Sequence, residues 1–172
     1  MKRNLFLGGV IPGIILIFSC VSDVRAQYNT AVGIRIGGTS GVTAKYFYKP
    51  TMAAEGIIGT FGDGFSITGL MEKYSPVYNA TGLYVYYGGG AHIAFYNDGS
   101  NYARPFGREI DYHKNNDVAF GIDGIVGLEY RLPENIPIAF SLDLKPLVEV
   151  GSGGHVGFAP DPSIGIKFII HK

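Results

Sequence analysis

Apolar and polar side chains alternate along most of the chain from about residue 30 onward. Residues 121–130, GIDGIVGLEY, are typical, because Asp123 and Glu129 occupy odd positions while Ile122, Val126 and Leu128 occupy even ones. A strand has a side-chain period of two, so it would place both carboxylates on one face and the bulky apolar groups on the other. The alternation therefore predicts a strand with one charged and one apolar face.

Turn signals divide the chain into about eight such segments. The sequence GGTSG at 37–41 and the Gly62-Asp63-Gly64 turn can adopt positive φ angles, and Pro50 ends a strand. We predict an exposed polar loop at 97–117 and a glycine-rich connection at 147–158. The predicted strands are 30–37, 41–49, 52–60, 64–74, 82–96, 117–131, 136–146 and 156–171.

The charged face of these strands can point to water or to a barrel lumen. In a soluble barrel or sandwich the charges meet solvent, whereas in an outer-membrane barrel the apolar face meets lipid. Three observations favour the membrane barrel. Small residues accompany the charges, as the crowded lumen of eight strands requires. Cations and anions are equal in number, which allows the pairing that buried charges need. Strands of about nine to eleven residues can cross a bilayer.

We therefore predict an all-β fold, an eight-stranded antiparallel up-and-down transmembrane β-barrel. Its lumen would hold residues that are candidates for ion pairs: Arg35, Lys45, Glu55, Glu72, His92, Asp123, Glu129, Arg131, Asp143, Lys145 and Lys167.

The first 26 residues have the composition of a signal peptide. A basic start is followed by an apolar run at 5–19 and by Val24-Arg25-Ala26, a small-residue cleavage sequence. Residues 27–172 would then form the barrel domain, without a cysteine for disulfides, thiol catalysis or metal binding. A competing interpretation is a lipoprotein cleaved before Cys20. The formal net charge of +0 gives no indication of a nucleic-acid partner.

Three segments carry a resemblance to a known family: GIRIGGTSGVTAKYF, YYGGGAHIAFY and GIDGIVGLEYRLPENIPIAFSLDLKP. Over residues 28–171 the chain resembles the small outer-membrane β-barrel proteins of Gram-negative bacteria. This eight-stranded class includes the OmpA transmembrane domain and OmpX, and the chain is similar to short barrels of the Bacteroidetes. The resemblance implies an outer-membrane location, with membrane lipid and the barrel-insertion machinery as partners. Such barrels commonly end on an aromatic residue, whereas this chain ends FIIHK.

No sequence motif for catalysis or metal binding stands out. Ser152, His155 and Glu149 are close in sequence, but a glycine-rich loop does not hold a triad in fixed geometry. We interpret His92 as a hydrogen-bonding residue of the lumen and His113 as part of the polar loop. We expect no enzymatic activity, no metal and no cofactor.

The expected function is that of a non-catalytic outer-membrane barrel with a largely plugged lumen and an extracellular interaction loop at 97–117. The sequence does not define the partner of that loop. Alternatives are a narrow small-solute channel, a lipid-modifying barrel enzyme, and a soluble periplasmic barrel that binds an apolar ligand. The last alternative predicts an apolar lumen. Candidates for aromatic girdles at the membrane interfaces are Tyr46, Tyr48, Tyr87 and Tyr130.

Overall fold

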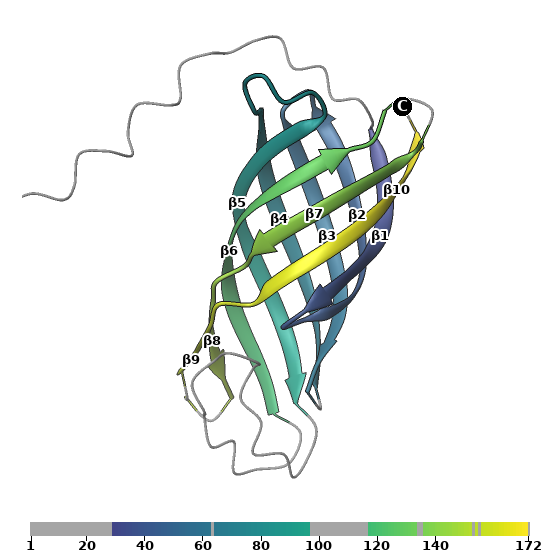
Figure 1. Ribbon diagram of the computed structural model, residues 1–172. Helices are drawn as coiled ribbons and strands as arrows, with labels where there is room; N and C mark the ends of the chain where they lie inside the picture. Colours follow the sequence, from purple (N-terminus) through teal and green to yellow (C-terminus); the bar gives the residue numbers. More distant parts are fainter. Residues whose placement is uncertain are drawn as a thin grey trace, which may run out of the picture.

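A computed structural model shows a closed barrel of tilted antiparallel strands (Figure 1). It describes residues 29–62, 64–96, 117–133, 136–152, 154 and 156–171. The predicted signal peptide, most of the 97–117 loop, His113 and His155 lie outside the described residues. The strands are β1 Thr30–Gly37, β2 Ser40–Lys49, β3 Met52–Phe61, β4 Gly64–Pro76, β5 Leu83–Tyr96, β6 Asp117–Arg131, β7 Ile138–Leu144, β8 Leu147–Gly151, β9 Val156–Ala159 and β10 Pro162–His171.

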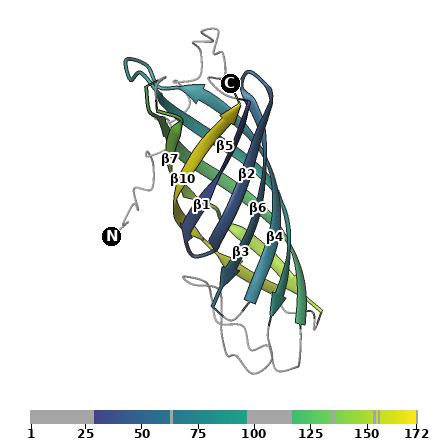
Figure 2. The same cartoon turned by 90° about the vertical axis from the view of Figure 1, so that its right-hand side faces the viewer.

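The strands close into a ring of eight positions. Strands β1 to β6 pair with their sequence neighbours, and β10 pairs with both β7 and β1. β6 pairs with β7 through residues 126–131 and with β8 through residues 119–123, so β7 and β8 share one position in the wall. β9 and β10 share the next position. The predicted eight-stranded antiparallel barrel is confirmed, and Figure 2 shows its strands from the side.

The prediction of a loop at 147–158 is wrong for most of its length. Residues 147–151 and 156–159 form β8 and β9, which pair with each other. Apolar and polar residues still alternate there, and only the turn between the two strands is glycine-rich. The prolines at 146 and 160 have no N–H group and therefore interrupt the two strands rather than ending them. Two backbone bonds join neighbouring strands at this level: the Lys145 N–H donates to the Asp161 carbonyl at 3.1 Å, and the Gly124 N–H donates to the Pro146 carbonyl at 2.8 Å.

The two ends of the barrel differ. We call the end where β1 begins and β10 ends the terminal end, and the opposite end, where Tyr96 pairs with Asp117, the loop end. At the terminal end β4 runs to Pro76, two residues beyond its predicted end, so the connection to β5 is a short turn with Asn79 and Gly82 at φ 59° and 81°.

None of the described residues forms a helix that could span a membrane.

Burial alternates along the strands with the predicted period of two. In β4 every second side chain from Gly64 to Tyr74 is buried, and those between them are exposed. The buried side chains point into the barrel and include most of the charged side chains that the structure describes. Most of the exposed ones are apolar, and Lys73 is an exception in β4. The wall is therefore polar inside and apolar outside, which is the reverse of a water-soluble barrel.

Candidate functional site

The lumen is the part of this molecule with the densest chemistry. Every lumen residue expected from the sequence is buried, with a relative exposure of 8% or less. The soluble alternative required an apolar lumen, and the lumen is charged. The residues placed there are Arg35, Lys45, Glu55, Glu72, His92, Asp123, Glu129, Arg131, Asp143, Lys145 and Lys167.

Lys45 is the centre of a first group of charges, which we call the terminal-end cluster. Its Nζ lies 2.9 Å from a Glu55 oxygen, 2.7 Å from a Glu72 oxygen and 3.7 Å from a Glu129 oxygen. The ammonium also donates to the Tyr74 hydroxyl, which lies 3.2 Å from Glu72 and 3.1 Å from Glu129. One buried cation thus holds carboxylates from three strands.

Two further cations complete the terminal-end cluster. Arg131 Nε donates to Glu129 at 2.8 Å, and the guanidinium lies 3.9 Å from the centroid of the Tyr84 ring. Lys167 Nζ lies 3.5 Å from a Glu55 oxygen. Three cations and three carboxylates therefore share this end of the lumen, and aromatic rings cover the guanidinium. This is the mutual pairing that buried charges need to offset their loss of hydration.

His92 organises a second group, the loop-end cluster. Its Nδ1 lies 2.8 Å from Asp123, and its Nε2 lies 2.9 Å from Glu149. Each ring nitrogen thus has a carboxylate oxygen within hydrogen-bond distance, one from β6 and one from β8. Lys145 bonds to Asp123 at 3.0 Å, and the Tyr96 hydroxyl donates to Glu149. His92 thus links β5 to β6 and β8 within the lumen.

Arg35 and Asp143 join the two clusters. Arg35 Nη2 donates to Asp143 at 3.1 Å and to Ser163 at 2.7 Å. The Tyr86 hydroxyl donates to the other Asp143 oxygen at 2.9 Å, while the Tyr86 ring lies 4.7 Å from Lys45 Nζ. Arg35 Nη2 also lies 4.0 Å from Asp161 Oδ2, which is 2.8 Å from Lys145 Nζ of the loop-end cluster, so a chain of contacts runs from one cluster to the other.

Two acids of the lumen were not among the expected lumen residues. Glu149 was assigned to a flexible rim loop, but it is 1% exposed on β8, where the local alternation could have revealed it. Asp161 lies between two prolines and reads as a turn residue. Its backbone has φ 38°, its Oδ2 lies 2.8 Å from Lys145 Nζ, and its Oδ1 accepts the Thr39 N–H at 2.7 Å. No sequence signal pointed to that role.

These polar groups do not converge as metal ligands. Within the described residues no group of three or more His, Cys, Asp or Glu side chains is arranged to hold a metal ion. Ser152 lies at the loop end with its N–H donated to the Val118 carbonyl at 3.0 Å, and its suggested partner His155 is outside the described residues. The ion pairs and hydrogen bonds of the lumen connect strands on different sides of the barrel.

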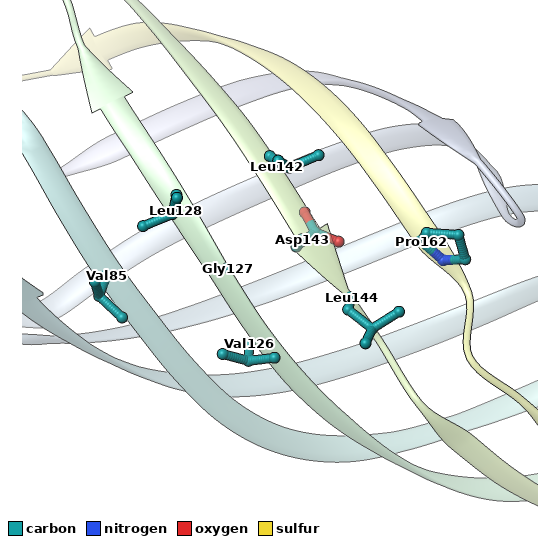
Figure 3. A pocket seen from close by; sticks show the side chains of 8 residues that line it. All are labelled: Val85, Val126, Gly127, Leu128, Leu142, Asp143, Leu144 and Pro162. Atoms are coloured by element: carbon teal, nitrogen blue, oxygen red, sulfur yellow. The ribbon is translucent and has the colours of Figure 1, made fainter. Parts of the chain in front are cut away.

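The outer face carries large apolar side chains on strands all around the barrel. Ile34 is 50% exposed, Ile58 57% and Ile122 69%. A groove of about 410 Å³ lies over β5, β6, β7 and β10. Figure 3 shows the residues that line it. Its rim is apolar, and it is lined by Val85, Val126, Gly127, Leu128, Leu142, Asp143, Leu144 and Pro162.

Exposed aromatic side chains collect towards the two ends of the outer face. Tyr46, Tyr87 and Tyr130 lie near the terminal end, and Tyr48 there is half-buried. At the loop end Phe65 stacks on Phe95 with ring centroids 4.7 Å apart, and other exposed aromatics there are Phe120 and Phe158. An apolar band thus lies between a tyrosine-rich and a phenylalanine-rich end.

Comparisons of the chain with protein-family models, with curated proteins and with solved structures found no match. Functional inference therefore depends on the lumen and on the outer face.

Proposed function

We propose that this protein is an integral outer-membrane β-barrel that acts without catalysis, as a plugged scaffold rather than as an open pore. The observation that carries the proposal is the inverted polarity of the wall. Soluble monomers rarely expose contiguous apolar patches of more than a few hundred Å², and here the apolar surface extends over strands all around the barrel. Lipid is the environment in which such a surface is stable.

The arrangement of aromatics supports the same proposal. Transmembrane barrels carry an apolar band about 25 Å tall between girdles of aromatic residues at the two interfaces. Tyr46, Tyr87 and Tyr130 would form one girdle, and Phe65 and Phe120 would belong to the other. The likeness of the sequence to OmpX-type barrels and the signal-peptide composition of residues 1–26 agree with export to the outer membrane.

The charged lumen supports a plugged rather than a conducting state. Eight strands leave an interior that side chains fill. Here Tyr74 and Tyr86 lie side by side in the lumen, with ring centroids 5.0 Å apart, and Lys45 contacts both rings. In this proposal the barrel holds the 97–117 segment at the cell surface, where a partner would bind.

Heat-modifiable migration tests the proposal. The protein is extracted with detergent from the outer-membrane fraction and run on a denaturing gel with and without boiling. We expect a compact band that shifts on boiling and that is found only in the membrane fraction. Recovery of folded protein from the periplasm without detergent would contradict the proposal. Single-channel recording of the same sample should show no steady conductance, and a stable open level would support the channel alternative instead.

A further inference from the structure

Among the described residues, the outer face carries two exposed charges, and both are lysines. Among the side chains that the structure describes, Lys49 and Lys73 alone are both charged and exposed. The other described charges are buried in the lumen. On the described strand wall, both cations lie at the terminal end, at the edge of the apolar surface.

Strand register brings these lysines into one row. Lys49 pairs with Met52, Met52 pairs with Lys73, and Lys73 pairs with Tyr87. The register shift between Phe47 and Lys49 breaks the alternation of β2 and places Lys49 opposite Met52. Since neighbouring strands lie about 4.8 Å apart, the two lysine backbones are about 10 Å apart. Two lysine side chains can span that distance and meet at a group between them.

Among the described residues, no carboxylate balances this row. Neither Lys49 nor Lys73 forms an ion pair with an acidic side chain of the described residues. The row lies at the terminal end of the apolar band, beside the exposed Tyr46 and Tyr87. Two neighbouring cations at the edge of an apolar surface are complementary to a lipid that has an anionic headgroup and apolar acyl chains.

We propose that Lys49 and Lys73 bind the phosphate of an anionic phospholipid, with Met52 beneath the headgroup and the acyl chains along the outer wall of β3 and β4. Basic side chains at a membrane surface attract anionic lipids in this way. Beyond the row Gly56 pairs with Gly69, and a Cβ added at either would meet no atom within 4 Å, so open space for an acyl chain lies there. The inference rests on the proposed function, and its lipid belongs to the leaflet at the terminal end.

Lipid retention in native mass spectrometry tests this proposal. The folded full chain in detergent is mixed with equal amounts of dioleoylphosphatidylglycerol and dioleoylphosphatidylcholine, which differ only in the headgroup. We expect wild type to retain the anionic lipid in preference. The double variant Lys49→Gln/Lys73→Gln should lose that preference. Each lysine should contribute about fivefold to the ratio of anionic to zwitterionic lipid retained. Lys49→Arg/Lys73→Arg should keep it.

A matched control removes the same charge elsewhere. Arg108→Gln/Lys114→Gln changes two cations of the 97–117 segment and should keep the wild-type preference. The proposal is overturned if wild type shows no preference, if this control loses it equally, or if one lysine accounts for the whole effect. Excess inorganic phosphate should not displace the lipid, and displacement would assign the row to free phosphate instead.

The two proposals fail in distinguishable ways. A barrel that shifts on boiling and enters micelles but shows no headgroup preference refutes the lipid site alone. A chain that stays folded and soluble without detergent refutes the membrane proposal itself.

Discussion

The inner and outer faces of the same wall obey different rules. On the inner face each charged side chain that the structure describes has specific partners, as Lys45 has Glu55 and Glu72, at distances of 2.9 and 2.7 Å. On the outer face exposed Val, Ile and Leu side chains recur on many strands. The stability of the inner face depends on specific pairs of residues, whereas the outer face requires only that its side chains are apolar. Substitutions of matched chemistry on the two faces should therefore have unequal effects.

The largest effect is expected from Lys45→Met. It leaves Glu55, Glu72 and Glu129 buried without the ammonium that joins them, and breaking a buried ion pair costs about 3–5 kcal/mol. The free energy of unfolding can be measured in lipid vesicles from the unboiled compact band as urea increases. A gel readout suits this protein because its sequence contains no tryptophan, so unfolding cannot be followed by tryptophan fluorescence. Lys73→Met makes the same change on the outer face, and it should change the free energy of unfolding by roughly 0.5 kcal/mol at most. Equal losses would remove the distinction between the faces.

Charge placed in the apolar band is expected to have the next largest effect. Ile166 is 48% exposed near the middle of β10, and Ile166→Lys should destabilise the barrel in vesicles by about 2–4 kcal/mol. Val156→Lys, near the loop end, should cost roughly 0–1 kcal/mol because it lies close to an interface. If both variants are as stable as wild type, the outer face does not meet hydrocarbon.

Crowding of the inner face should give an intermediate effect. A Cβ at Gly127 would lie 2.6 Å from Tyr86 Cζ and 2.8 Å from Asp143 Cβ. Gly127→Ala should therefore displace Tyr86 and cost about 1–3 kcal/mol. The same urea series measures the loss, and near-ultraviolet circular dichroism reports the tyrosine environment. An unchanged tyrosine spectrum would show that the contact is not as tight as described.

The smallest effect is expected from Gly69→Ala. This outer position has no atom within 4 Å of an added Cβ, so the change should stay within roughly 0.5 kcal/mol of wild type. It is the outer counterpart of Gly127→Ala, and the difference between the two isolates packing from the general effect of replacing glycine in a strand. A larger loss at Gly69 than at Gly127 would reverse the comparison.

Much of the fold follows from local pattern. The strands at 30–37 and 117–131 have the predicted bounds, because an uninterrupted alternation with clear turn signals is a local property of the chain. The region 147–158 was mispredicted because its glycines outweighed a short alternation around Glu149. The same short-range pattern assigned His92 and Asp123 to the inner face, but it carries no information on which residues of that face meet.

The sequence by itself determined which residues share a face, since a strand has a side-chain period of two whatever it pairs with. Only the tertiary structure decided the partners. His92 meets Glu149 across 57 positions of sequence, and Arg35 meets Asp143 across 108, because ring closure and strand register bring distant strands together. The row of Lys49, Met52 and Lys73 likewise exists only through register. Side-chain alternation is local, whereas pairing in a closed sheet depends on every strand around it.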